Sequence, residues 1–256
     1  DGYARIGDTW YGLPDDGDVF VMYYRKDLFA DPGNQEEFKA KFGYELAPPK
    51  TYQEFDDIGR FFTEKYSAEG IYGGAFQHLE GQAWDWFVGP FSGAGGQFFD
   101  PETMDATINS AAGVKVLSDM VKASEWMPPG VQKWGFTEVL SAWLDGKLAM
   151  TLNGPWFLGD LRARGTPYVI EPVPPGSHPA ASFIGVNGLM VNQLSPRKQD
   201  AFPLVEYLGS KDCQVTMALA SGRVPARRDA QAEVAKDPVK GPDIAAFTRV
   251  VEQGVA

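Results

Sequence analysis

The chain has 256 residues, of which 44% are hydrophobic and 13% aromatic, and its 23 Lys and Arg against 34 Asp and Glu give a formal net charge of −11. A chain of this length and aromatic content buries about 70–75% of its unfolded surface, so we expect one large folded domain or two smaller ones. The acidic balance argues against nucleic acid and anionic lipid as partners, because both attract basic surfaces. The single cysteine, Cys213, excludes an internal disulfide framework and a cysteine-rich zinc site.

The first third of the chain predicts strands that alternate with helices. Residues 19–24 are β-branched and aromatic and follow a turn-rich stretch, a pattern typical of a buried strand. Thr51 and Glu54 form a capping box ahead of apolar residues at helical spacing, which predicts a helix that starts at Thr51. The other predicted elements of this part are helix on both sides of a break at Pro32-Gly33 and a short strand at 71–76.

The remaining two thirds continue this alternation, which indicates an α/β fold. A helix capped by Ser110 is expected to bury a face formed by Val114, Leu117, Met120 and Val121. The strands before residue 153 are expected to share one sheet, covered by the helices that begin at 51, 110 and 136. The other predicted elements are a helix at 136–144, a strand at 147–152, a proline-rich crossing segment at 167–179, a strand at 188–191, and helices at 195–208, 210–221, 229–236 and 242–253.

Familiar catalytic and cofactor motifs are missing from the sequence. The two histidines, His78 and His178, lie far apart, and no metal-ligand spacing surrounds either of them. No G-x-S-x-G nucleophile motif occurs, and the glycine-rich residues 93–96 are not followed by the Lys-Ser/Thr of a phosphate-binding loop. We therefore expect no catalytic residue, no metal and no cofactor.

Acidic and aromatic residues instead gather at predicted turns. Sugar C–H faces stack on aromatic rings while sugar hydroxyls donate to carboxylates, so this combination suits a neutral polyhydroxylated ligand. Trp156 is the best placed, because it follows a turn at the end of a strand, where α/β folds bind ligands. The candidates are Asp16 and Asp18 before the first strand, Trp84, Asp85 and Trp86 near a helix start, and Trp156 after the Gly154-Pro155 turn.

Several stretches share their order and spacing with one known family. The most specific spans residues 136–156, where a helix, an acid-Gly-Lys turn, a short strand and Gly-Pro-Trp follow one another. The others are Tyr11-Gly12-Leu13-Pro14, Tyr24-Arg25-Lys26-Asp27-Leu28, Pro49-Lys50-Thr51-Tyr52, Leu194-Ser195-Pro196-Arg197-Lys198 and Ala235-Lys236-Asp237-Pro238. Together they resemble the carbohydrate-binding members of the extracellular solute-binding proteins of ABC importers, family 1, of which the maltodextrin-binding proteins are the best known.

The resemblance implies a periplasmic-binding-protein-like fold of type II, in which two α/β lobes joined by a hinge clamp a sugar between them. It also implies a monomer that is periplasmic or extracytoplasmic, is not an enzyme, and delivers a small carbohydrate to an ABC permease in the membrane. Matched by position, Asp18 contacts sugar hydroxyls, Trp156 stacks on a sugar face, and Asp85 with Trp86 falls in a contact segment. Two further matches are the crossover from Gly185 to Gly188, which includes Asn187, and the cleft-lining Arg223.

The family's first lobe begins with a long segment ahead of the Tyr11-Gly12-Leu13-Pro14 stretch, and only ten residues precede it here. We therefore expect an internal fragment with an incomplete first lobe. The expected division is residues 1–18 as the end of the first lobe and a crossover strand, 19–182 as the second lobe, 183–236 as a returning segment of the first lobe, and 237–256 as a return to the second lobe.

Two other functions remain open from the residues alone. A glycoside hydrolase would use an acid pair, either Asp16 with Asp18 or Asp85 with Glu80, with its carboxyl groups roughly 5–9.5 Å apart across a bound sugar. A binding protein for a quaternary ammonium ligand would cage it by cation–π contacts with Trp84, Trp86 and Trp156 around Asp85. The candidates include one Arg and no Lys, which disfavours a phosphorylated or carboxylated ligand.

Overall fold

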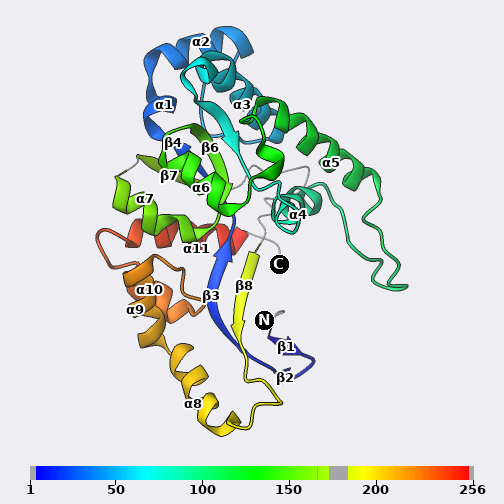
Figure 1. The fold of residues 1–256 in the computed structure, drawn as a ribbon, viewed down its shortest axis with the longest axis vertical. Helices are drawn as coiled ribbons and strands as arrows, with labels where there is room; N and C mark the ends of the chain where they lie inside the picture. The colour runs from blue at the N-terminus through cyan, green and yellow to red at the C-terminus, as the bar shows by residue number, and fades with distance from the viewer. Residues whose placement is uncertain (1–3, 166, 173–183, 254–256) are drawn as a thin grey trace.

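The computed structural model describes residues 4–165, 167–172 and 184–253 (Figure 1). Its centre is a four-stranded sheet in the order β5-β6-β4-β7, where β5 and β6 run parallel and the other neighbours run antiparallel. The strands are β4 (Val21–Arg25), β5 (Tyr72–Ala75), β6 (Leu148–Asn153) and β7 (Tyr168–Pro172). Three of them come from the strands predicted to share one sheet, so that prediction is confirmed.

Helices cover both faces of this sheet, which is why its central strands are buried on both sides rather than on alternate residues. All six residues of β6 are buried, as are four of the five in β4. The helices are α1 (Lys26–Ala30), α2 (Pro32–Phe42), α3 (Tyr52–Tyr66), α4 (Ala83–Gly93), α5 (Ala111–Ala123), α6 (Phe136–Leu144), α7 (Leu158–Arg164), α8 (Lys198–Leu208), α9 (Lys211–Ser221), α10 (Arg228–Val234) and α11 (Gly241–Gln253).

The predicted helix caps are present. The Thr51 hydroxyl accepts from the backbone N–H of Glu54 at 3.1 Å, and the side chains of Ser110 and Ser210 cap α5 and α9 in the same way. The Glu54 carboxylate accepts from the backbone N–H of Lys50 at 2.6 Å, so the capping box reaches one residue further back than the usual pattern.

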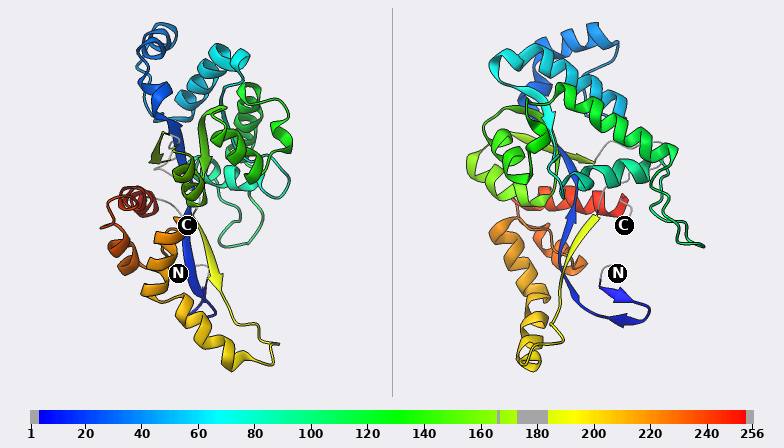
Figure 2. Two further views of the ribbon diagram at one scale, coloured as in Figure 1. Left: turned by 60° about the vertical axis from the view of Figure 1, so that its left-hand side comes forward. Right: turned by 45° about the vertical axis from the view of Figure 1, so that its right-hand side comes forward.

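A two-stranded ribbon leads out of the sheet. It pairs β3 (Leu13–Val19) antiparallel with β8 (Ile184–Leu189), and β3 continues directly into β4. In all three views β3 and β8 run side by side from the central sheet toward the part of the molecule that holds α8, α9 and α10 (Figures 1 and 2). A small hairpin of β1 (Arg5–Ile6) and β2 (Thr9–Trp10) precedes the ribbon.

Three predictions about strands need correction. The strand predicted at 19–24 is divided at Phe20, because β3 ends there and pairs with β8 while β4 begins and joins the sheet. The strand predicted at 188–191 lies earlier, at Ile184–Leu189. The start of the proline-rich segment is β7, an edge strand of the sheet where proline is tolerated, and not a crossing segment; residues 173–183 lie outside the described part.

The buried face of α5 is also different from the predicted one. Val114, Leu117 and Val121 are 58%, 57% and 65% exposed, and of the expected face only Met120 is buried. The face that packs inward carries Gly113, Val116, Met120 and Ala123. The physical reason is packing: Val116, Met120 and Ala123 belong to the buried core cluster of the sheet, whereas Val114, Leu117 and Val121 lie on the opposite side of the helix.

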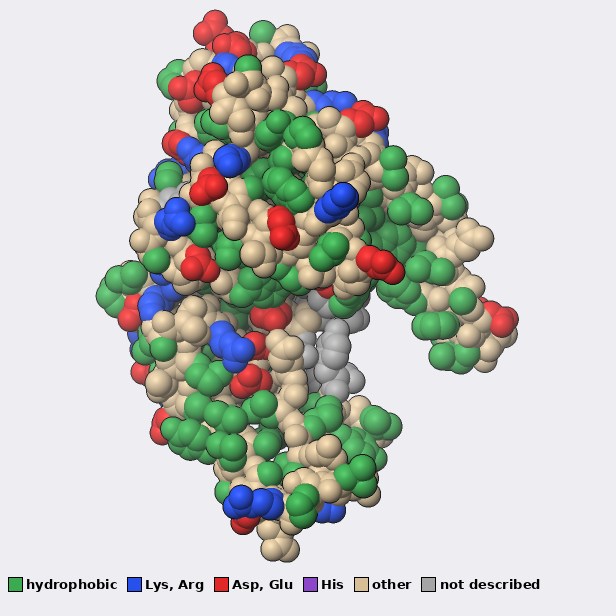
Figure 3. All heavy atoms as spheres, in the orientation of Figure 1, with side chains coloured by type: hydrophobic (Ala, Val, Ile, Leu, Met, Phe, Trp, Pro, Cys, Tyr) green, Lys and Arg blue, Asp and Glu red, His purple; other side chains and the backbone are tan. Residues whose placement is uncertain are grey.

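The part of the chain after the ribbon is packed unevenly. None of the residues of α8 is buried, and Phe202, Leu204 and Tyr207 are more than half exposed. Figure 3 shows hydrophobic side chains gathered over this end of the molecule. Leu189, Val191 and Leu208, in contrast, are partly buried.

Other residues after the ribbon join the central core. Ala218, Val224 and Val234 belong to the same buried cluster as the sheet, and so do Ile244 and Phe247 of α11. The predicted division into lobes at 18, 182 and 236 therefore stays a prediction, with α8 as the element least attached to the sheet. Among the described residues, no helix is both long and apolar enough to cross a bilayer.

Candidate functional site

Four of the predicted site residues meet on the ribbon. Its register places Asp16 opposite Asn187 and Asp18 opposite Gly185. The side-chain amide nitrogen of Asn187 donates to Oδ1 of Asp16 at 2.9 Å and to Oδ2 of Asp18 at 3.1 Å. One amide group therefore holds both carboxylates on the same side of the ribbon.

Arg223 completes this cluster. It follows the left-handed Gly222 that ends α9, and its guanidinium contacts Asp15 at 2.9 Å and Asp16 at 3.7 Å. Gly17 binds the same turn, because its N–H donates to the carbonyl oxygen of Val224 at 2.9 Å. The arginine balances Asp15 and Asp16 and leaves the charge of Asp18 less compensated.

The electrostatics of Asp18 follow from this arrangement. Burial, and then the negative charge of Asp16, raise the pKa of Asp18 from 3.8 to about 7. Arg223 and the hydrogen bond from Asn187 lower this pKa, but they do not offset the burial. Asp18 can thus change its protonation state near neutral pH, and a ligand hydroxyl that donates to it would favour the ionised form.

Trp156 packs on Phe20, the residue that follows the ribbon strand β3. Its ring packs edge-to-face on Phe20 at 5.6 Å and on Phe136 at 5.4 Å, measured between ring centroids. Asp16 and Asp18 lie two residues apart in β3 and share one face of the ribbon. Phe20 follows β3, so its contact with Trp156 connects the predicted aromatic residue to the end of the ribbon.

Gly154 allows the Trp156 ring to take this position. A Cβ on Gly154 would lie 2.0 Å from the indole, so no other residue fits without moving the ring. The Tyr23 hydroxyl donates to the carbonyl oxygen of Gly154 at 2.8 Å and fixes the turn after β6.

Sequence analysis did not identify two polar residues beside this turn. β5 and β6 are parallel with Ala75 opposite Thr151, so Gln77 and Asn153 emerge side by side at the carboxyl edge of the pair. Both side chains are 0% exposed. Within the described part of the chain, Oε1 and Nε2 of Gln77 and Nδ2 of Asn153 have no hydrogen-bond partner, and neither does Nε1 of Trp156.

Such a group of unpartnered buried polar atoms is uncommon, because nearly all buried polar groups in proteins are hydrogen-bonded. Its location, at the carboxyl end of parallel strands, is where open α/β sheets bind ligands. His78 adjoins it: Nδ1 pairs with the carbonyl oxygen of Phe76 at 2.9 Å, and burial lowers the pKa of the ring, which favours its neutral form. The only signal in the sequence was the position of Gln77 and Asn153 directly after apolar strands.

The predicted group Trp84, Asp85 and Trp86 lies in the first turn of α4 and is spread over different environments. Trp84 is 50% exposed, whereas Trp86 is 5% exposed and stacks on Phe76 with ring centroids 4.0 Å apart. Asp85 is 8% exposed, and burial raises its pKa to about 6. Trp86 thus lies in the core against Phe76.

The described residues contain no group of three or more His, Cys, Asp or Glu side chains placed to hold a metal ion. The arrangement offers aromatic faces, carboxylates and side-chain amides, which suit hydrogen bonding and stacking with a neutral ligand.

The comparisons with known proteins define the class of the protein. Residues 1–244 match the family model described as bacterial extracellular solute-binding protein, and the chain belongs to this family. The matched family and the solved relatives are solute-binding proteins, in agreement with the prediction of a binding protein rather than an enzyme. The solved relatives have the type II periplasmic-binding-protein fold, which confirms the predicted fold class.

Three relatives illustrate the similarity. The chain is 25% identical over 238 residues to a galactooligosaccharide-binding protein of Bacillus subtilis, a match that covers 86% of this chain and 50% of that protein. It is 26% identical to the maltotriose-binding protein of Thermus thermophilus bound with maltotriose, with a TM-score of 0.72 and coverage of 98% and 62%. It is 24% identical to maltose-bound MalE3 of T. maritima, with a TM-score of 0.77 and coverage of 98% and 63%. The chain thus spans about half the length of its curated relative.

Proposed function

We propose that this chain belongs to the substrate-binding subunit of an ABC sugar importer, and that it binds a neutral sugar or polyol between its two lobes. The observation that carries the proposal is the grouping of Trp156 with the acids of the ribbon and with the unpartnered amides of Gln77 and Asn153. The names of the relatives support a carbohydrate, since those proteins bind galactooligosaccharide, maltotriose or maltose.

Each group has a defined role in this proposal. The exposed part of the Trp156 ring stacks on the C–H face of a sugar ring. Asp18 accepts from sugar hydroxyls, and the carboxamides of Gln77 and Asn153 both donate and accept. Gln77 and Asn153 are 0% exposed in this structure, so a polyhydroxylated ligand would satisfy their unpartnered atoms once the residues that cover them have moved; each such buried atom otherwise costs about 1–3 kcal/mol.

The mechanism proposed is hinge closure. The β3–β8 ribbon leads from the central sheet to α8–α10, so a small change in its twist would move these two parts relative to one another (Figure 2). A sugar that contacts Trp156 on one part and the ribbon acids on the other favours the closed state by its differential contacts. The proposal includes a membrane permease that recognises the closed state, and a monomer that acts in the periplasm or outside the cell.

The geometry favours this function over glycoside hydrolysis. The two carboxyl groups of a glycosidase flank the scissile bond from opposite sides. Here Asp16 and Asp18 bind the same nitrogen of Asn187, so they lie on one side of any ligand. A cation–π cage also finds less support, because Phe76 covers a face of the Trp86 ring.

The test is a calorimetric titration of the full-length protein that carries this sequence, with maltotriose and with a galactooligosaccharide. Trp156→Ala should weaken the binding of the preferred sugar at least tenfold, since stacking contributes about 0.5–1.5 kcal/mol beyond the area it buries. Trp10→Ala is the matched control, because Trp10 is 49% exposed in the β1–β2 hairpin and should leave affinity within twofold. Equal affinities of the two variants would refute the role of Trp156, and release of reducing ends by the wild type would favour a hydrolase.

A further inference from the structure

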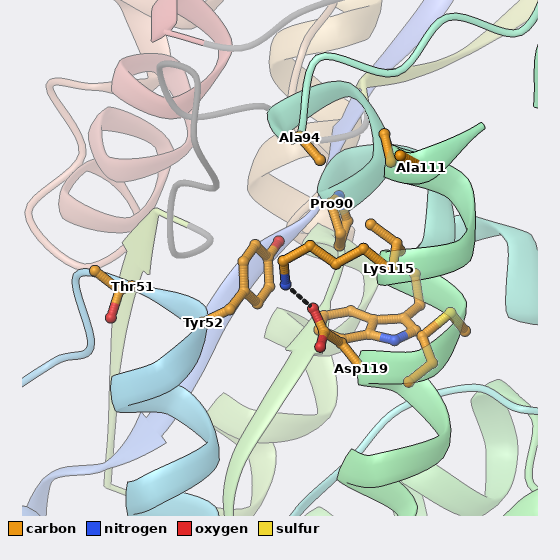
Figure 4. Close-up of a pocket in the computed structure, with 11 residues that line it drawn as sticks. Thr51, Tyr52, Pro90, Ala94, Ala111, Lys115 and Asp119 are labelled. Atoms are coloured by element: carbon orange, nitrogen blue, oxygen red, sulfur yellow. Dashed lines mark hydrogen bonds and ion pairs between the residues drawn. The ribbon is translucent and has the colours of Figure 1, made fainter.

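A second cavity lies away from the residues proposed to bind sugar. It has a volume of about 430 Å³ and opens between the N-terminus of α3 and the facing sides of α4 and α5 (Figure 4). Tyr52 comes from α3, Trp86 and Pro90 from α4, and Ala112 and Val116 from α5. Its lining includes neither the ribbon acids nor the residues at the carboxyl edge of β5 and β6.

Small side chains at helical spacing create this space. Trp86 and Pro90 lie four residues apart on one side of α4, Ala94 follows the last residue of this helix, and Ala112 begins the facing side of α5. The alanines leave room at one end, because a larger side chain at either position would fill it. At the other end of the cavity, the rings of Tyr52 and Trp86 pack edge-to-face and form an aromatic corner. Their centroids are 5.9 Å apart and the interplanar angle is 76°.

The polar groups of the cavity are few and balanced in charge. Lys115 Nζ lies 2.5 Å from Oδ2 of Asp119 at the exposed mouth, so the two charges cancel (Figure 4). Both residues also line a smaller adjoining hollow of about 120 Å³, which places the ion pair between the two. The indole N–H of Trp86 is buried with no acceptor among the described residues. That indole N–H has no accessible surface, so the cavity offers the N–H donors of Lys115 next to apolar walls and carries no net charge.

We propose that this cavity binds a second ligand, a neutral aromatic molecule of one or two rings that carries a carbonyl group. The volume lies at the small end of the range of ligand pockets, about 300–1,000 Å³, which fits one or two rings. The aromatic corner supplies offset or edge-to-face contacts with such rings. The ammonium of Lys115, which has three N–H donors, can bind a carbonyl oxygen while it keeps its contact with Asp119.

The probe is 2-naphthamide, titrated into the full-length protein by calorimetry and by ligand-observed saturation-transfer NMR. The expected result is saturable binding at one site. Ala112→Leu and Ala94→Leu fill the cavity from its two sides and should each weaken binding at least tenfold. The matched control is Ala163→Leu on the exposed side of α7, which should stay within twofold of the wild type. Thermal melts of each variant establish that it is folded.

A charged probe of the same shape tests the chemical class. 2-Naphthoate should bind at least fivefold more weakly than 2-naphthamide, because its carboxylate would lie beside Asp119 as well as Lys115. The proposal is overturned if 2-naphthamide shows no saturable binding. It is also overturned if both filled variants bind 2-naphthamide as the wild type does, whether or not maltotriose displaces the compound. Equal or tighter binding of 2-naphthoate would overturn the assignment to a neutral ligand.

Discussion

Asp18→Asn tests the electrostatics of the ribbon, because burial and the charge of Asp16 disfavour the ionised form of Asp18 in the folded protein. Its pKa in the folded protein is about 7, against 3.8 for the free side chain. The folded state therefore holds the proton more tightly than the unfolded state. The free energy of unfolding should fall as the pH rises from about 4 to about 7, and stay at its lower value above that.

The size of the change in the free energy of unfolding follows from this difference between the folded and unfolded pKa of Asp18. About three pH units correspond to about 4 kcal/mol for a fully buried group, and the partial exposure of Asp18 reduces this figure. Asparagine keeps an oxygen that accepts from Asn187 and removes the charge facing Asp16. We therefore expect Asp18→Asn to stabilise the protein by about 1–3 kcal/mol at pH 8 and by less than about 0.5 kcal/mol at pH 4.

Urea unfolding at pH 4, 6 and 8 measures this directly. Asp160→Asn is the control, since Asp160 is exposed on α7 and should change stability by no more than about 0.5 kcal/mol at any of these pH values. The same Asp18→Asn protein should bind sugar more weakly, because a charge-assisted hydrogen bond becomes a neutral one. A variant that is less stable than the wild type at pH 8 would refute the reasoning.

The remaining predictions concern packing around the site. Gly154→Ala should displace the Trp156 ring, which would lie 2.0 Å from the new Cβ; sugar affinity should fall at least tenfold and the near-UV circular dichroism should change. Trp156→Phe should keep part of the affinity lost in Trp156→Ala, and equal losses in the two would argue against stacking. Arg162→Met should lower the free energy of unfolding in urea by about 2–4 kcal/mol. The ion pair of Arg162 with Asp243, at 2.6 Å, is four-fifths buried, and its loss leaves a buried carboxylate without its cation. A loss under about 0.5 kcal/mol would show that the pair is solvated.

Local signals in the sequence predicted the helices and strands. The buried face of each helix and the pairing of the strands depend on contacts between distant segments. The cap at Thr51 depends on two residues three positions apart, so the sequence pattern alone was sufficient to predict it. The buried face of α5 could not be predicted, since Leu117 and Val116 lie on different sides of one helix and only packing against its neighbours selects between them. β7 was missed because it ends in Pro172 within a proline-rich stretch typical of a connecting segment, although an edge strand tolerates proline.

The candidate site shows the same limit. Composition at turns brought out Asp18 and Trp156, and the family resemblance added Asn187, but nothing in the sequence joined them. The pairing of β3 with β8 joins Asp18 to Asn187, and the contact of Phe20 with Trp156 connects Trp156 to the end of β3. Gln77 was missed because its significance comes from the parallel pairing of β5 with β6, which are more than seventy residues apart.

The most direct test of sugar binding is the crystal structure of the full-length protein with its best-bound sugar, chosen from maltotriose and galactooligosaccharides. The account predicts a sugar ring packed on Trp156, with hydroxyl oxygens within about 2.7–3.2 Å of Asp18 and of Gln77 or Asn153. A sugar bound elsewhere on the protein, with the side chains of Gln77 and Asn153 still unpartnered, would contradict it.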